Sequence, residues 1–400
     1  MNRRKKQTVL WGMTAVLLLS CFACAAPPAE ETESRGETES SQPTEDESRE
    51  ESQAEPEAEL DYTRLKEPLA LPESSRICSD TLAEQALLLC TGHSMGKERT
   101  LLEQAGFRVL VQKNYDKTTE DSSHTCAWTA ASRRIEYQGR PRTVIVLAIR
   151  GTQDGEWNSN FDFDPSHSGE SQTAGNFLFA AEDIFLSVLA LAAEDEEPLF
   201  LVCGHSRGAA CANWLGVLLN AQYGTERVFT YTFATPATWR ESQAEWNDEN
   251  IFNWINPEDP VPQVPLAAWG YRRFGTDIVL TGNAERETEL QKTIRILEEL
   301  APTPEQYYKE RHSLTQAGLA EDGMTCFEFM LLLTSLARTS GNNGEGSRLA
   351  AIAADSDFAP LLRRLEEILQ ESGGAALQPH SPAVYQRLIR ERAAEANGLY

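Results

Sequence analysis

The run LFLVCGHSRGAACANWLGVLL constrains the fold of this chain more than any other stretch. Its first part, Leu199–Cys203, is a short continuous apolar segment, which is typical of a parallel strand buried on both faces. Small residues surround Ser206, and the apolar stretch Ala212–Leu219 has the composition of a buried helix. A G-x-S-x-G sequence between a strand and a helix predicts a sharp turn that exposes the serine hydroxyl. The run therefore predicts an α/β fold with a mainly parallel central sheet flanked by helices.

The same five-residue pattern also occurs earlier, as GHSMG at residues 92–96, in a different context. The preceding DTLAEQALLLCT has apolar residues at helical spacing, so a helix rather than a strand comes first. Lys97, Glu98 and Arg99 follow, where a strand-to-helix turn needs small side chains. We therefore predict that Ser94 is a loop or helix-cap serine and that Ser206 is the nucleophile.

A catalytic serine on such a turn is followed along the chain by an acid and then by a histidine. Asp259 lies in the loop NPEDPVPQVP after an apolar stretch, although an aspartate before proline could also simply shape a turn. The downstream histidines are His312, in YYKERHSLTQAG, and His380, in ALQPHSPAVY. The prolines around His380 are more typical of a helix entry, while His312 could itself cap a helix. We predict the triad Ser206, Asp259 and His312.

Hydrogen-bond donors for the negatively charged oxygen of the transition state are expected at two places. The sequence PRTVIVLAIRGTQDGEW contains a buried strand, Thr143–Ile149, that ends at an Arg-Gly-Thr sequence. Thr152 can offer its backbone N–H and its hydroxyl there. The second donor is expected to be the backbone N–H of Arg207, the residue after the nucleophile. Removing one such donor typically slows a reaction by about 100- to 1000-fold.

Taken together, these sequences resemble the class 3 lipase family of α/β-hydrolases, which includes the fungal triacylglycerol lipases. The matching elements are AIRGT with the Trp157 that follows it, VCGHSRGAA, TFATPA, NPEDPVPQVP and a histidine 53 residues after Asp259 (312 − 259). They cover roughly residues 76–316. The resemblance implies the α/β-hydrolase fold and the following site residues: Ser206, Asp259 and His312 as the triad, with Thr152 and Arg207 as oxyanion donors.

Two features depart from the family pattern. The family's GHSLGGA reads GHSRGAA here, so Arg207 places a charge beside the site, where its side chain could point to solvent or meet an anionic group of the substrate. The segment between Trp157 and Gly175 is polar and lacks the amphipathic helix that forms an apolar lid in fungal members. We therefore do not expect strong interfacial activation.

The first 24 residues are typical of a lipoprotein signal peptide. The cations Arg3–Lys6 precede an apolar run, Val9–Leu19, that is shorter than the roughly 20 residues of a membrane-spanning helix. The sequence LLSC resembles a lipobox, so lipidation is expected at Cys21 or, at a slightly later site, Cys24. This predicts a protein anchored to the membrane by lipid, on the extracellular face of a bacterial cell. An ordinary secretory signal, and hence a secreted protein, is the alternative.

The remaining chain is expected to form three further segments. Residues 25–65 are rich in Glu, Ser, Thr and Pro and predict a disordered acidic linker. Residues 66–318 are expected to form the α/β-hydrolase domain. Residues 319–400 are expected to be a helical extension packed on that domain, with helices over Thr325–Arg338, Phe358–Gln370 and Ala383–Ala394.

Charge and cysteine content exclude some classes of function. The chain has a formal net charge of −25, so it lacks the excess of basic residues that is typical of a nucleic-acid-binding protein. Two of the eight cysteines lie in the signal segment, and the other six permit disulfides without establishing any. Cys203 and Cys211 lie in apolar runs and are expected in the core. The sequence contains no cysteine or histidine cluster with zinc-ligand spacing, so neither a metal nor another cofactor is expected.

The function expected from these features is that of a serine carboxylic-ester hydrolase, a lipase or esterase that works through an acyl-enzyme intermediate. Its substrate would be a lipid or another small ester. A phospholipase, or a carboxylesterase for small acyl groups, is the alternative within enzymes. A non-catalytic, surface-tethered binding protein on a hydrolase scaffold is the alternative outside them. The sequence does not determine the acyl chain length, the head group or the oligomeric state.

Overall fold

The computed structural model describes residues 59–92, 94–115, 125–151, 177–192, 197–240, 245–280 and 375–396, and positions 290, 291, 294, 298 and 398. Contacts divide the chain after Pro56, and all of these residues belong to the second unit, Glu57–Tyr400. Among the described helices, none combines the length and the apolar character that a membrane span needs. The expected signal peptide, with Cys21 and Cys24, lies outside the described residues.

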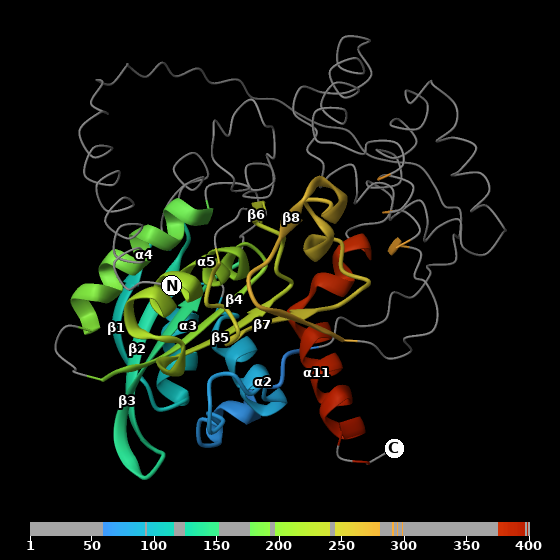
Figure 1. Cartoon of the computed structure of the whole chain (residues 1–400). Helices are drawn as coiled ribbons and strands as arrows, with labels where there is room; N and C mark the ends of the chain where they lie inside the picture. The colour runs from blue at the N-terminus through green and yellow to red at the C-terminus, as the bar shows by residue number, and fades with distance from the viewer. Residues whose placement is uncertain are drawn as a thin grey trace, which may run out of the picture. The chain divides into compact units, whose positions relative to one another are not determined.

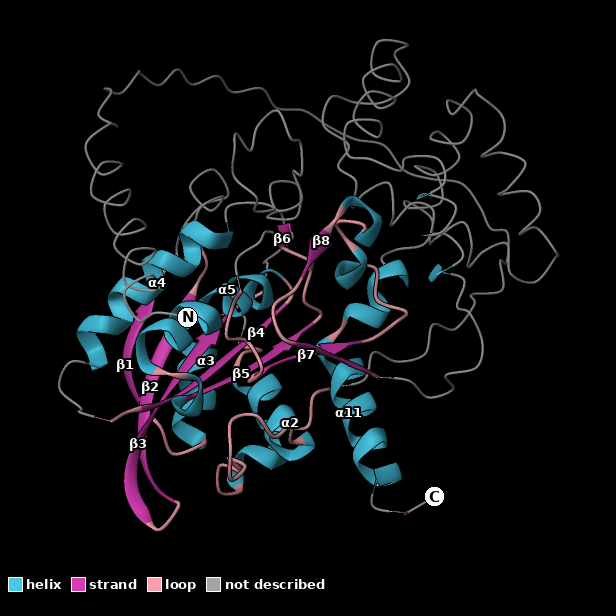
Figure 2. Ribbon diagram, in the orientation of Figure 1, coloured by secondary structure: helices cyan, strands magenta, loops and turns pink. Residues whose placement is uncertain are grey.

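A seven-stranded sheet forms the centre of the molecule, and its strands follow the order β1-β2-β3-β4-β5-β7-β9 (Figures 1 and 2). The pairs from β3 to β9 are parallel, whereas β1, β2 and β3 pair antiparallel. This arrangement confirms the predicted α/β class with a mainly parallel sheet. The strands are β1 Arg108–Lys113, β2 Trp128–Tyr137, β3 Arg140–Ile149, β4 Leu199–His205, β5 Val228–Phe233, β7 Ile251–Ile255 and β9 Thr276–Val279. A separate pair is formed by β6 Trp239–Arg240 and β8 Tyr271–Arg272.

Helices cover both faces of this sheet. Side chains of α2, α3 and α11 form one apolar cluster with the sheet, and side chains of α4 and α5 form another on the opposite face. The helices are α2 Asp80–Leu89, α3 Met95–Gln104, α4 Phe177–Ala192, α5 Arg207–Tyr223 and α11 Pro382–Ala396. Short 3-10 helices are η1 Tyr62–Lys66, η3 Thr225–Arg227, η4 Val261–Gln263, η5 Ala267–Trp269 and η6 Ala375–His380.

Strand β4 shows why the apolar run Leu199–Cys203 folds as it does. Every residue of β4 is buried, because the strand lies between β3 and β5 with helices above and below. Leu201 and Cys203 belong to the cluster with α2, whereas Phe200 and Val202 belong to the cluster with α5. A strand buried on both faces needs apolar residues at every position. The predicted strand is therefore confirmed, as is the prediction that Cys203 and Cys211 are core residues.

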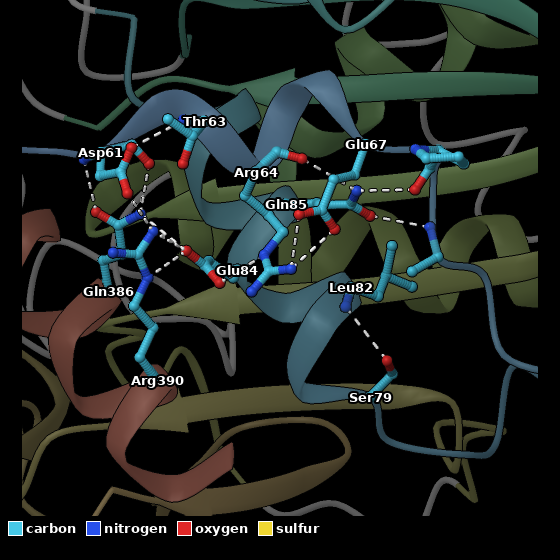
Figure 3. A network of polar contacts seen from close by, with 12 residues as sticks. Asp61, Thr63, Arg64, Glu67, Ser79, Leu82, Glu84, Gln85, Gln386 and Arg390 are labelled. Atoms are coloured by element: carbon cyan, nitrogen blue, oxygen red, sulfur yellow. Dashed lines mark hydrogen bonds and ion pairs between the residues drawn. The ribbon is translucent and has the colours of Figure 1, made fainter. Parts of the chain in front are cut away.

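The N-terminal segment of the described chain is fastened to α11 by a network of polar contacts (Figure 3). Gln386 donates to the Asp61 carbonyl oxygen at 2.7 Å and to Glu84 Oε1 at 3.0 Å. Arg390 donates to the same Glu84 oxygen at 2.6 Å and to Asp61 Oδ2 at 2.9 Å. The linker was expected to continue to residue 65, whereas Asp61 already contacts α11 and Leu65 is buried. These contacts, which join distant parts of the chain, cannot be read from the composition of the segment.

The C-terminal extension is partly described. The expected helix Ala383–Ala394 is present as α11, while the expected helices Thr325–Arg338 and Phe358–Gln370 lie outside the described residues. Within the part of the chain that is described, no disulfide joins the cysteines, which are Cys78, Cys90, Cys126, Cys203 and Cys211.

Candidate active site

Ser206 lies on the turn between β4 and α5, with a backbone conformation that is rare for a residue with a side chain. Its φ and ψ are 58° and −126°, a region of backbone strain that is typical of functional turns. The Ser206 N–H donates to the Phe233 carbonyl oxygen at 2.9 Å, and the Ser206 carbonyl oxygen accepts from Ala209 and Ala210. The buried Ser206 Oγ has no hydrogen-bond partner among the described residues. This hydroxyl therefore does not cap the helix that it precedes.

Glycines allow the backbone to pack closely around this turn. A Cβ atom added to Gly204 would lie 2.3 Å from the Gly208 carbonyl oxygen, and one added to Gly208 would lie 2.3 Å from the Ile149 carbonyl oxygen. A Cβ atom added to Gly151 would lie 2.9 Å from the His205 carbonyl oxygen. Each glycine thus permits a backbone contact that any side chain would block. As a result, the end of β3 lies directly against the serine turn.

Ser94, in the first copy of the motif, is the N-cap residue of α3. Its φ is −136°, and its hydroxyl accepts a hydrogen bond from the Lys97 N–H at 3.3 Å. An N-cap serine satisfies one of the N–H groups that a helix leaves without a partner at its start. The prediction that Ser94 is a helix-cap serine is confirmed.

Asp259 is fully buried in the loop after β7, and its carboxylate accepts three hydrogen bonds. Its Oδ1 accepts from the Val261 N–H at 2.9 Å, which closes the turn that an Asp-Pro sequence favours. Its Oδ2 accepts from His380 Nδ1 and from the Tyr385 hydroxyl, each at 2.8 Å. Asp259 therefore shapes its own turn and also orients a histidine.

His380 is the histidine that the structure brings to Asp259. It is the last residue of η6, two residues before α11 begins, so it does lie at a helix entry. Its ring nevertheless points into the protein, toward Asp259, which the flanking prolines did not suggest. His312, the histidine predicted from spacing, lies outside the described residues.

The partners of Asp259 determine where the hydrogens lie. A carboxylate oxygen only accepts, so His380 Nδ1 carries the hydrogen and, in the neutral ring, Nε2 keeps its lone pair. The Tyr385 hydroxyl accepts from the Asn256 N–H at 3.2 Å and donates to Asp259. Burial, and then the negative charge of Asp259, raise the pKa of Tyr385 well above its usual value. Tyr385 thus stays protonated and remains a donor to Asp259.

His380 also lies beside the serine turn. Its ring centroid is 4.6 Å from that of His205, the residue before Ser206. His205 Nε2 is 2.9 Å from the His380 carbonyl oxygen. The Ser206 turn, the Asp259 loop and His380 are therefore in mutual contact through neighbouring residues.

Buried asparagine pairs fix α5, the helix that follows Ser206, against β7, the strand that precedes the Asp259 loop. Asn213 of α5 donates to Asn253 Oδ1 of β7 at 2.9 Å. Farther along α5, Asn220 donates to Asn250 Oδ1 at 2.7 Å. Buried amides have to be paired, since an unpaired one costs free energy. These pairs therefore favour one register between α5 and β7.

Of the two predicted oxyanion donors, one is described. Arg207 is the first residue of α5, where the backbone N–H groups at the helix N-terminus can bind an anion. Its side chain is buried, donates to the Thr125 carbonyl oxygen at 3.0 Å and lies over the Phe177 ring, 5.6 Å from its centroid. Of the two orientations considered from the sequence, the one toward solvent is therefore excluded. Thr152 lies outside the described residues.

Another buried carboxyl group, Glu98, lies in α3, and its charge interacts with that of Arg150, the residue after β3. Burial raises the pKa of Glu98 to about 8, although the Gly92 backbone N–H and the Arg150 charge act to lower it. Neither carboxyl oxygen makes a hydrogen bond of ordinary geometry within the described residues. No sequence pattern marked this group, because Glu98 lies among charged residues that look exposed.

Comparison with known proteins relates part of the chain to one family. Residues 146–269, which include Ser206 and Asp259, match the family model for lipase (class 3). Secreted mono- and diacylglycerol lipase 2 of Gibberella zeae is 33% identical over 97 residues, covering 21% of this chain and 24% of that protein. Secreted mono- and diacylglycerol lipase A of Penicillium cyclopium is 25% identical over 149 residues, covering 35% of this chain and 48% of that protein. This chain thus spans less than half the length of these curated relatives.

Among solved structures, the Rhizomucor miehei lipase in complex with its propeptide is similar in part. It is 18% identical, with a TM-score of 0.40, and the match covers 57% of this chain and 77% of that chain.

Proposed function

We propose that this chain, whose residues 146–269 match the class 3 lipases, is a serine carboxylic-ester hydrolase of the lipase type. The observation that carries the proposal is the buried contact of Asp259 with His380 next to the Ser206 turn. A serine on a strained turn, a histidine and a buried acid that is bonded to the histidine's Nδ1 are the three groups of a catalytic triad. We assign the base to His380 rather than to His312, because Asp259 is already bonded to His380.

The reaction follows from these roles. His380 Nε2 takes the proton from Ser206 as Oγ attacks the ester carbonyl carbon, and the carbon–oxygen bond to the alcohol then breaks. The alcohol leaves with the proton from His380, and an acyl-enzyme remains on Ser206. Water then attacks the acyl-enzyme while His380 takes its proton, and Ser206 regains a proton from His380 as the carboxylic acid product leaves. Throughout, Asp259 holds the Nδ1–H tautomer and stabilises the imidazolium.

Negative charge on the carbonyl oxygen needs donors that are already in place. The Arg207 N–H at the start of α5 fits this role, since the N-terminus of a helix carries partial positive charge. We propose Thr152 as the second donor, as its place after Gly151 suggests. The close packing of Gly151 against the serine turn supports this. A Cβ atom added to Gly151 would lie only 3.5 Å from Ser206 Cβ, so the chain reaches the site at residue 151.

The substrate class follows from the relatives, which are named as mono- and diacylglycerol lipases. We propose that this chain acts on acylglycerol esters, with phospholipids or small acyl esters as the alternatives. We further propose that lipid on Cys21 or Cys24 holds the enzyme on the extracellular face of a bacterial membrane. An ester series of increasing acyl length would distinguish these substrates.

The proposal is tested by fluorophosphonate labelling of the purified full chain. Attack by Ser206 Oγ forms an oxygen–phosphorus bond and releases fluoride, so mass spectrometry of peptides identifies the activated serine. We expect the label on Ser206, and its loss together with ester hydrolysis in Ser206→Ala and His380→Ala. His312→Ala is the matched control and should keep both. Label on Ser94, or activity that survives in His380→Ala and is lost in His312→Ala, would overturn the assignment.

A further inference from the structure

The main chain around His380 is held by side chains from both of the other loops of the site. On the serine turn, the Nε2 atom of His205 lies 2.9 Å from the His380 carbonyl oxygen. Asn256, at the start of the acid loop, donates from its Nδ2 to the Pro379 carbonyl oxygen at 2.9 Å. Two consecutive carbonyl groups of η6 are thus bound from two different directions.

We infer that His205 and Asn256 are positioning residues that place His380 for catalysis by holding its main chain. The inference rests on the proposed function, because it assumes that His380 is the base. Neither residue needs to touch the substrate. Their effect would be transmitted through the position of the His380 ring.

In both contacts the side chain is the donor and the carbonyl oxygen of η6 is the acceptor. A carbonyl oxygen only accepts, so the hydrogen of His205 lies on Nε2. The amide of Asn256 is oriented by its second contact, because Asn256 Oδ1 accepts from the Glu258 N–H at 3.1 Å. The nitrogen of the amide is therefore the atom that faces Pro379. Both side chains are buried, at 7% and 4% exposure, so water does not readily replace these donors.

The contacts matter because Asp259 alone does not fix the place of the ring. The bond from His380 Nδ1 to Asp259 sets the rotation and tautomer of the ring, whereas the carbonyl bonds set the position of its backbone. The histidine lies on η6, a 3-10 helix, and 3-10 helices have weaker hydrogen bonds than α-helices. A displacement of about 1 Å at a catalytic group can cost roughly 100-fold in rate.

The first test compares His205→Leu with His205→Gln in the full chain. The Nε2 of glutamine reaches about as far as the Nε2 of histidine and carries hydrogens, so the glutamine variant keeps the donor. On a soluble p-nitrophenyl ester, well below the melting temperature, we expect His205→Leu to lower kcat by about tenfold or more, with KM changed by less than about threefold. We expect His205→Gln to recover kcat to within about threefold of wild type.

A second variant keeps the test valid if His205→Leu does not fold. Asn256→Asp preserves the oxygen that accepts from Glu258 and replaces the donor to Pro379 with an oxygen, so kcat should again fall with KM nearly unchanged. Asp80→Asn is the matched control. Arg392 of α11 pairs with Asp80 of α2, so this change loosens the same helix without touching η6. It should lower the melting temperature and leave kcat unchanged.

The outcomes separate the inference from the proposed function. Wild-type protein that neither labels at Ser206 nor hydrolyses esters would overturn the proposed function. If the wild type is active and His205→Leu has the same kcat as wild type, only the inference is overturned. An equal kcat loss in His205→Gln and His205→Leu, or in Asp80→Asn, would also overturn it, because the effect would then not depend on the donor at Nε2.

Discussion

The two G-x-S-x-G sequences of this chain have the same pattern and different structures. Ser94 has an extended backbone and caps α3, whereas Ser206 has a positive φ and leaves its hydroxyl without a cap hydrogen bond. The element that precedes each serine makes the difference. Helix α2 precedes the first, and the central strand β4 precedes the second.

This comparison shows that the pattern alone does not produce a strand-to-helix turn with a strained serine. A strand in the middle of a parallel sheet delivers the residue after it to the carboxyl edge, where the loops of neighbouring strands also end. The acid loop after β7 reaches this edge, so Ser206 and Asp259 come near each other. The helix pair α2 and α3 packs on a face of the sheet instead.

The largest expected difference between the two copies is in catalysis. Ser206→Ala removes the proposed nucleophile, and we expect kcat/KM for a p-nitrophenyl ester to fall by roughly 10⁴-fold or more. The melting curve should stay close to wild type, since the hydroxyl makes no hydrogen bond with described residues. Activity within about tenfold of wild type would contradict the assignment of Ser206.

The glycine two residues after each serine, Gly208 in the second copy and Gly96 in the first, offers a second comparison, now of stability. In Gly208→Ala the new methyl group would meet the Ile149 carbonyl oxygen, so we expect a loss on the order of 3 kcal/mol in unfolding free energy. A Cβ atom at Gly96 meets nothing within 4 Å. Gly96→Ala should therefore be neutral or stabilise α3 by up to about 1 kcal/mol. Urea denaturation of both variants measures this, and equal effects would mean that the two turns are packed alike.

Glu98, just after the first copy, predicts a pH dependence of stability. Its pKa rises from 4.5 to about 8 on folding, so between these pH values the unfolded chain releases a proton that the folded chain keeps. The contribution of Glu98 to the free energy of unfolding is therefore fully present below about pH 4.5 and is lost as pH rises toward 8. This loss is on the order of 1.4 kcal/mol per pKa unit, a few kcal/mol at most. Glu98→Gln should remove this loss.

The measurement is the melting temperature of wild type and Glu98→Gln at pH 5 and pH 8. We expect similar values at pH 5 and a higher value for the variant at pH 8. A variant that is equally or less stable than wild type at pH 8 would show that Glu98 is not held neutral by its surroundings.

The smallest expected effect is that of Ser94→Ala. Loss of the cap should lower the unfolding free energy by about 1 kcal/mol and leave ester hydrolysis unchanged. Ser79→Ala is the matched control, because Ser79 caps α2 through the Leu82 N–H in the same way. A loss of activity in Ser94→Ala that Ser79→Ala does not share would make the two copies functionally alike.

The local parts of the site could be predicted because each depends on neighbouring residues. The continuous apolar run fixes β4, the small residues fix the close turn at Ser206, and the Asp-Pro sequence fixes the turn of Asp259. Ser94 was separated from Ser206 by the same reasoning. All of these are interactions over a few residues, which the order of the side chains specifies directly.

What the sequence by itself determined is thus the α/β class, the strand-turn-helix unit of Ser206 and the loop of Asp259. Only the tertiary structure decided which part of the chain meets that acid. His380 reaches Asp259 across 121 residues, and Asp61 reaches Arg390 across 329. Such contacts depend on how whole helices pack against the sheet, and no local spacing of residues encodes them. That is why the neighbouring prolines correctly indicated a helix entry at His380 and gave no sign of its contact with Asp259.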